Sequence, residues 1–226
     1  MTPLSALEKQ LEIKFNTPAL LEQAFVHRSY LNENDFPLGH NERLEFLGDA
    51  VLELVVTEYL YHKFMNKPEG ELTALRSALV KKETLKQVSD ELKLYQYLKL
   101  SKGEAKSASN QITILANVVE ALVGSIFLDG GIQPAKDFLA KYLLPKLDVI
   151  MANQAYVDAK SQFQEIAQEK IGITPIYKVV AESGPDHNKS FEVAVCLGDK
   201  EIARGTGSSK QAAEMAAAES ALEHYH

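Results

Sequence analysis

The spacing of apolar positions divides the chain into two parts. In residues 1–150, apolar side chains recur every three or four positions, which is the period of a helix with one buried face. The predicted helices cover residues 3–14, 18–24, 41–64, 70–94, 113–128 and 134–150. Turns are expected at residues 68–70 and 129–131, and a polar loop at residues 102–110. This part is therefore expected to be an all-α domain.

After residue 158 the pattern changes from helix to strand and back to helix. Residues 159–171 have helical spacing, and three segments with strand character follow at residues 176–181, 190–197 and 201–206. Residues 209–225 are so rich in alanine that a helix is expected, with Ser208 or Ser209 as its cap. The prediction is a small αβββα domain over residues 159–226, joined to the first by a linker at residues 151–158.

Composition narrows the class of protein. The 226 residues are 46% hydrophobic, which is enough for a core in one medium domain and one small domain. The single cysteine, Cys196, excludes an internal disulfide and leaves no thiol cluster for zinc. We expect no membrane span and no signal peptide, and hence a cytoplasmic protein. The net charge of −7 means that any nucleic-acid binding must come from local patches.

Three carboxylates share one face of the predicted helix 41–64. Glu42, Glu45 and Asp49 are spaced i, i+3 and i+7, and most residues around them are apolar. Carboxylates in a mostly buried helix are costly unless a positive group lies against them. The alternative is a solvated acidic face, which is the common role of such a stripe taken alone.

A second polar pair interrupts the otherwise apolar helix 113–128. Asn117 and Glu120 are three residues apart and share a face. Together with the acidic stripe they would form an oxygen-rich cluster, which hard cations such as Mg²⁺ and Mn²⁺ prefer, and no histidine or cysteine stands at zinc-ligand spacing. The pattern favours metal-dependent phosphoryl chemistry, with a purely structural polar cluster as the alternative.

These segments resemble a known family. Residues 41–52, Asn-Glu-Arg-Leu-Glu-Phe-Leu-Gly-Asp-Ala-Val-Leu, resemble the signature of the ribonuclease III family, and residues 114–131 resemble its second acidic helix. The resemblance extends to His27-Arg28-Ser29, to residues 69–80 and to a C-terminal double-stranded-RNA-binding domain. It implies a homodimeric, Mg²⁺-dependent endoribonuclease, with Mn²⁺ as a substitute and no organic cofactor. Such an enzyme cuts both strands of an RNA duplex, leaves 5′-phosphate and 3′-hydroxyl ends, and processes rRNA and mRNA precursors.

The resemblance also assigns roles to single positions. Asp49 and Glu120 are the expected catalytic residues. The expected metal ligands are Glu45, Asp49, Asn117 and Glu120. Glu42 and Glu71 are the expected accessory acids, although Glu71 could equally be a first-turn acid stabilised by the helix dipole. Phe46 matches the aromatic residue that the family inserts into the partner subunit, whereas the sequence alone would place it in the core.

Asn117 departs from the family, which usually has aspartate there. An amide can coordinate a cation through its carbonyl oxygen, but it brings no negative charge. Three interpretations stay open: an active natural variant with a raised metal requirement, a protein that has lost its chemistry and only binds RNA duplexes as a dimer, or a deliberately altered sequence. A helical metal hydrolase acting on nucleotides is a more distant alternative, which the C-terminal domain argues against.

The C-terminal domain offers three candidate contacts to an RNA duplex, which together resemble the double-stranded-RNA-binding domain. A polar helix face suits the shallow minor groove, a loop after the first strand suits a second minor groove, and the start of the last helix suits a phosphate. The expected RNA-binding residues are Ser161, Gln164, Glu165, Gln168, Pro185, His187, Ser209 and Lys210. Taken singly, each would be an ordinary solvated face or turn.

Overall fold

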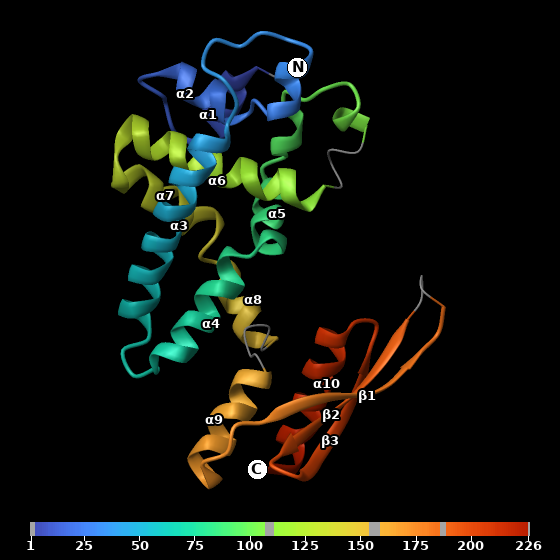
Figure 1. Cartoon of the computed structure of the whole chain (residues 1–226). Helices are drawn as coiled ribbons and strands as arrows, with labels where there is room; N and C mark the ends of the chain where they lie inside the picture. The colour runs from blue at the N-terminus through green and yellow to red at the C-terminus, as the bar shows by residue number, and fades with distance from the viewer. Residues whose placement is uncertain (1–2, 107–110, 154–158, 186–188, 226) are drawn as a thin grey trace. The chain divides into compact units, whose positions relative to one another are not determined.

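The computed structural model describes residues 3–106, 111–153, 159–185 and 189–225, and it divides into two compact units, Met1–Tyr156 and Val157–His226. The regular elements described in the first unit are helices, and the second contains a three-stranded sheet with two helices (Figure 1). The expected fold class, an all-helical unit followed by an αβββα unit, is confirmed.

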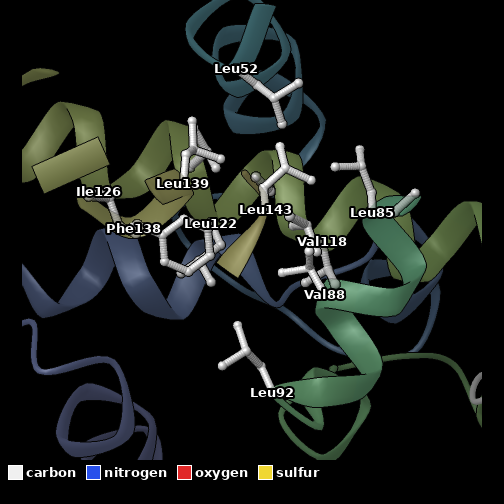
Figure 2. Close-up of a cluster of buried hydrophobic side chains, with 14 of the residues drawn as sticks. Leu52, Leu85, Val88, Leu92, Val118, Leu122, Ile126, Phe138, Leu139 and Leu143 are labelled. Atoms are coloured by element: carbon white, nitrogen blue, oxygen red, sulfur yellow. The ribbon is translucent and has the colours of Figure 1, made fainter. Parts of the chain in front are cut away.

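The first unit is organised around one apolar helix, α6. Its helices are α1 (Leu4–Leu11), α2 (Pro18–Ala24), α3 (Glu42–Lys63), α4 (Glu69–Val80), α5 (Lys82–Glu91), α6 (Ile112–Gly130), α7 (Ile132–Tyr142) and α8 (Lys146–Ala152). Short 3₁₀ turns lie at Arg28–Asn32, Leu94–Gln96 and Glu104–Lys106. Helices α2, α3, α5 and α7 all pack against α6, so its side chains are surrounded by protein. Figure 2 shows Leu85 and Val88 of α5 close to Val118 of α6 within this core.

Helix α6 is long and apolar enough, by length and composition alone, to cross a membrane. It is not an uncharged stretch, because it contains Glu120 and Asp129. In this fold 61% of its apolar window is buried inside the protein, because four helices cover it. The composition of α6 is therefore accounted for by its place at the centre of the core.

Two glycines let α3 and α6 approach each other closely. A Cβ atom added at Gly48 would lie 1.8 Å from the backbone oxygen of Glu120, and one added at Gly124 would lie 2.2 Å from that of Leu44. No side chain fits at either point, because a backbone atom stands in the way. This contact sets the distance between the two helices that carry the candidate site.

The helix predicted over residues 70–94 is two helices, and this prediction was wrong. Lys81 has extended backbone angles (φ −63°, ψ 153°) and separates α4 from α5. The buried hydroxyl of Thr84 donates a hydrogen bond to the carbonyl of Ala78 at 2.8 Å and so stabilises the corner. The apolar period continues through the break, which is why the sequence pattern does not reveal it.

The helix predicted over residues 134–150 is also two helices. α7 ends at Tyr142 and α8 starts at Lys146, because Pro145 lacks an N–H and restricts the residue before it. Met151 and Ala152, predicted as linker, belong to α8, and residues 154–158 lie outside the described part of the chain.

Three shorter predictions also need correction. A helix was predicted over residues 3–14, but α1 ends at Leu11, because Glu12 adopts left-handed backbone angles (φ 60°). The turn expected at residues 68–70 is the first turn of α4 after Pro68. Part of the predicted loop 102–110 is a 3₁₀ turn, and residues 107–110 are not described.

Asp129 belongs to α6, although a turn was expected at residues 129–131. Only Gly131 (φ 82°) breaks the helix. The Asp129 carboxylate accepts hydrogen bonds from the backbone N–H groups of Asn16 at 2.8 Å and Thr17 at 2.7 Å. It therefore satisfies donors at the start of α2 that would otherwise lack a partner in that helix.

The second unit packs two helices on one face of an antiparallel sheet. The elements are α9 (Ala159–Ile171), β1 (Ile176–Ser183), β2 (Ser190–Leu197), β3 (Lys200–Gly207) and α10 (Lys210–Tyr225), and the strand order is β1-β2-β3. A Cβ atom at Gly205 would lie 2.1 Å from the backbone nitrogen of Ala217, and one at Gly207 would lie 2.5 Å from that of Ala213. The glycines of β3 and the alanines of α10 thus allow the backbone of the strand to lie close to the backbone of the helix.

Gly124→Ala is expected to destabilise the helical unit by roughly 3 kcal/mol, because overpacking against a rigid backbone outweighs the gain of at most about 1 kcal/mol in helix propensity. Denaturant unfolding followed by circular dichroism measures this change. Gly103→Ala is the matched control, since its new Cβ meets only Ser101 Oγ at 3.9 Å. A Gly124→Ala variant as stable as the parent would contradict the close α3–α6 contact.

Candidate functional site

The α3–α6 contact brings together the carboxylates expected at the metal centre. Glu45 is half-buried and Asp49 is exposed on α3, while Asn117 and Glu120 are half-buried on α6. Glu120 interacts electrostatically with both Asp49 and Glu45. The residues expected as metal ligands therefore face one another from two helices that are far apart in the sequence.

Glu120 has the strongest electrostatic perturbation in this group. Burial raises the pKa of its carboxyl from 4.5 to about 7, and the charges of Asp49 and Glu45 act in the same direction. A raised pKa favours the folded state at low pH, so this contribution to stability is fully present below about pH 4.5 and is lost as pH rises through 7. A bound cation would offset this repulsion, since it stabilises the ionised carboxylates.

Two neighbouring groups partly offset the negative charge. The Asn117 side chain donates a hydrogen bond to the Glu45 carboxylate and lowers its pKa, whereas burial, as the largest effect, raises it. The ammonium of Lys82, the first residue of α5, lowers the pKa of both Glu45 and Glu120. The sequence analysis expected a positive group near the buried carboxylates but did not identify it. Lys82 is such a group.

The donor set fits a hard divalent cation in its chemistry. Carboxylates and an amide carbonyl are the oxygen ligands that such ions take, at about 2.0–2.6 Å. As the side chains stand, no three histidine, cysteine, aspartate or glutamate groups in the described ranges lie close enough to hold one ion. The side chains would therefore have to turn toward the ion, with the Asn117 amide rotated to present its oxygen.

The two expected accessory acids have other partners. Glu42 is exposed and lies 3.6 Å from Arg28 and 3.7 Å from His40. Glu71 lies in the first turn of α4 and forms an i,i+4 ion pair with Lys67. The position of Glu71 agrees with its interpretation as a helix-start acid, and no interaction described for it reaches the carboxylate cluster.

Phe46 is not a core residue. Its side chain is 81% exposed, although aromatic residues on apolar helices are usually buried. Leu54, also on α3, is 60% exposed. Phe46 borders a hollow of about 650 Å³ lined by Gln23, His40, Glu42, Arg43, Leu44, Phe46, Leu47 and Leu128.

The polar residues expected to contact RNA lie on one exposed face of α9. Ser161, Gln164, Glu165 and Gln168 are all exposed, and the buried positions of the same helix are Ala159, Phe163 and Ala167. Gln168 accepts a hydrogen bond from Thr174 at 3.3 Å. The helix therefore presents short polar groups outward, as the spacing predicted.

The start of α10 combines a capped helix end with a lysine. Ser209 Oγ accepts a hydrogen bond from the backbone N–H of Ala212 at 3.1 Å, so Ser209 serves as the cap. Lys210 is exposed and pairs with Glu182 at 3.2 Å, a weak surface interaction that a phosphate could replace. Pro185 is exposed, and His187 lies outside the described residues.

Asn41 and the two packing glycines were not recognised as structural residues of the site. Asn41 is 3% exposed, and its side chain donates to the carbonyl of Ala24 at 3.1 Å. Its backbone N–H donates to the carbonyl of Val26 at 2.8 Å, which fixes the start of α3. A glycine inside each of two apolar helices was the available signal for their close approach.

Comparisons with known proteins agree with the two-unit fold. A family model described as ribonuclease-III-like matches residues 17–147, and a double-stranded RNA binding motif matches residues 159–225. Ribonuclease 3 from Protochlamydia amoebophila is 45% identical over 96% of this chain and 90% of its own length. Ribonuclease 3 from Streptococcus sanguinis is 42% identical over 96% of this chain and 94% of its own length.

A solved structure is similar to the helical unit. The nuclease domain of ribonuclease III from Campylobacter jejuni is 36% identical, with a TM-score of 0.58, and the match covers 63% of this chain and 99% of that domain. That protein is described as flexible in a region involved in dimer formation. The family models together and the relatives each cover most of the present chain, which therefore belongs to the ribonuclease III family, as an endoribonuclease with a double-stranded-RNA-binding domain.

Proposed function

We propose that the chain cleaves both strands of double-stranded RNA at the cluster of Glu45, Asp49, Asn117 and Glu120, with Mg²⁺ as its cofactor and Mn²⁺ as a substitute. The observation that carries the proposal is the close α3–α6 contact, which brings Glu45 and Asp49 near Asn117 and Glu120. Burial, and then the charges of Asp49 and Glu45, raise the pKa of Glu120 to about 7, as expected where a divalent cation completes a site. The products would carry 5′-phosphate and 3′-hydroxyl ends, and rRNA and mRNA precursors are the proposed substrates.

The protein residues in this proposal position the metal and the water rather than form a covalent bond. A divalent ion, when bound, supplies Lewis acidity that activates water and neutralises charge at the phosphorus. Asp49 and Glu120 would hold the ion from opposite helices, with Glu45 and the carbonyl oxygen of Asn117 as further ligands. With no histidine among the expected ligands, the carboxylates would orient the attacking water more than they would act as lone bases.

The RNA-binding residues proposed on the second unit supply affinity and select the duplex form. The exposed polar face of α9 suits the 2′-hydroxyls of a shallow minor groove, and the start of α10 suits a phosphate through its N–H groups and Lys210. Ser208 and Gln211 stand where the family often has basic residues. The number of neutralised phosphates, and hence the salt dependence of binding, is therefore expected to be modest.

We further propose a cytoplasmic homodimer in which Phe46 of each subunit enters the hollow of the other. A two-fold interface pairs the same surface on both subunits, and Phe46 borders the hollow that would receive its counterpart. An aromatic side chain that is 81% exposed is costly in a monomer, because its apolar surface stays in water. The exposed Leu128 at the same hollow adds to the apolar area that the dimer would cover.

Glu120→Gln is expected to slow duplex cleavage at least about a hundredfold, because the substitution removes a metal ligand. In metal-free buffer it is expected to change duplex affinity by less than about threefold, because the second unit stays intact. The measurement is cleavage of a long labelled RNA duplex with Mg²⁺ or Mn²⁺, alongside filter binding. Single-stranded RNA and duplex DNA are expected to remain uncut.

The matched control is Glu58→Gln, since Glu58 is an α3 carboxylate paired with Lys136 outside the cluster. Cleavage at limiting metal should also rise with pH through about 7, because Glu120 must lose its proton to bind the ion. Unchanged cutting by the Glu120→Gln variant would overturn the assignment of the site.

Asn117→Asp is expected to lower the Mg²⁺ concentration for half-maximal cleavage by about tenfold, because it adds a negative charge among the ligands. Asn117→Ala, which removes the carbonyl oxygen as well, should raise it. If only the Asn117→Asp variant cuts, the parent chain binds duplexes and has lost its chemistry, as the alternative interpretation of Asn117 requires.

Phe46→Ala is expected to raise the dissociation constant of the dimer at least about thirtyfold, because a buried aromatic side chain is removed from each half of the interface. Sedimentation velocity over a concentration series measures the change. Val149→Ala serves as the control, since Val149 is 62% exposed on α8 and does not line the hollow. Equal dissociation constants for the Phe46→Ala variant and the parent would exclude this interface.

A further inference from the structure

Lys82 is a cation held at a fixed place beside the carboxylate cluster. It is the first residue of α5, and its side chain is exposed. The rest of α5 is anchored, because Leu85 and Val88 are fully buried in the core beside α6 (Figure 2). In addition, the Thr84 hydroxyl donates a hydrogen bond to the carbonyl of Ala78. The backbone that carries Lys82 is therefore set by the core of the unit.

The charge of Lys82 acts on the cluster from a third helix. The first turns of α5 pack against α6 at Val118, which directly follows Asn117, so Lys82 starts a helix that borders the cluster (Figure 2). Its positive charge acts on both Glu45 of α3 and Glu120 of α6. Among the residues that the structure describes, it makes no ion pair within 4.0 Å, unlike Lys86 one turn further along α5, which pairs with Asp90 at 2.6 Å. The ammonium therefore keeps its hydrogen-bonding capacity while it stands next to the proposed reaction site.

A cation at this position opposes the binding of a divalent ion. Glu45, Asp49 and Glu120 carry a formal charge of −3 when ionised, which Lys82 reduces to −2, and Asn117 contributes no charge. A site that already lacks one carboxylate is weakened further by a nearby lysine. A backbone phosphate of the RNA would remove the repulsion between Lys82 and the divalent ion. It can pair with the ammonium and can also serve as a ligand for the ion.

We propose that Lys82 binds a non-bridging phosphate oxygen of the RNA strand that lies at the metal centre, and so makes metal binding and duplex binding support each other. This inference rests on the proposed function of the cluster. In the free protein Lys82 repels the divalent ion; in the complex the phosphate neutralises Lys82 and adds an oxygen ligand. Coupling of this kind is reciprocal, so bound metal strengthens duplex binding by the same factor.

The first test is the affinity of the RNA-free protein for Mn²⁺ alone, by isothermal titration calorimetry. Lys82→Gln should tighten Mn²⁺ binding about three- to tenfold, because one positive charge is removed close to a divalent ion. Lys82→Arg should leave the affinity close to that of the parent. Lys86→Gln, which removes a charge from the same helix one turn away, is the matched control and should change little.

The second test is duplex binding in metal-free buffer as a function of salt concentration. Lys82→Gln should reduce the slope of log affinity against log salt by about one, as expected for the loss of one phosphate contact. With saturating Mg²⁺ the same variant should lower the single-turnover rate of cleavage at least about tenfold, and Lys82→Arg should restore most of it. Thermal unfolding of each variant verifies that the fold is kept.

The outcomes separate this inference from the proposed function. Tighter Mn²⁺ binding together with a reduced salt slope supports Lys82 as the phosphate ligand, even if the parent protein proves unable to cut. An unchanged salt slope, or Mn²⁺ binding that weakens in the Lys82→Gln variant, overturns it. Cleavage by the parent that Glu120→Gln leaves intact would instead overturn the proposed site.

Discussion

The close contact between α3 and α6 at Gly48 and Gly124 is the constraint on which the rest of the nuclease unit depends. Backbone meets backbone there, because neither position has room for a Cβ atom. The contact places Glu45 and Asp49 opposite Asn117 and Glu120, which the sequence separates by some seventy positions. Like charges would not gather in this way unless the apolar surfaces of both helices, buried around the contact, outweighed their repulsion.

The electrostatics of the cluster follow from that packing. Glu120 is held among carboxylates in a partly desolvated place, so its pKa rises to about 7 and the ionised site is unfavourable without a cation. Two features of this chain reduce the repulsion, namely the hydrogen bond from Asn117 to Glu45 and the ammonium of Lys82. Both features also weaken the attraction of the cluster for a divalent ion. Reducing the repulsion among the carboxylates therefore lowers the metal affinity.

The second unit uses the same kind of contact for a different purpose. Gly205 and Gly207 lie against the backbone of α10 near Ala213 and Ala217, so β3 and α10 pack with almost no side chain between them. The core is small, and its outer surfaces are left to polar groups such as the exposed face of α9. Short polar groups on an exposed helix face suit the shallow minor groove of an RNA duplex, which is recognised mainly by shape.

The sequence by itself determined the type and order of most elements, because helical and strand periods follow from which side chains must be buried. It also identified the two helices with a carboxylate stripe and an Asn–Glu pair, since polar groups in apolar helices stand out. It did not reveal the break at Lys81, because the apolar period continues across it. For the break near Pro145 the proline itself was an available signal, since it disfavours a helical conformation in the residue before it. Only the tertiary structure decided which groups meet. The raised pKa of Glu120 and the effect of Lys82 on it depend on helices that lie far apart in the sequence. The exposure of Phe46 likewise depends on how the helices pack around α3. Electrostatic interaction and burial depend on distances in space. The spacing of residues along the sequence predicts such distances only within a single helix or strand.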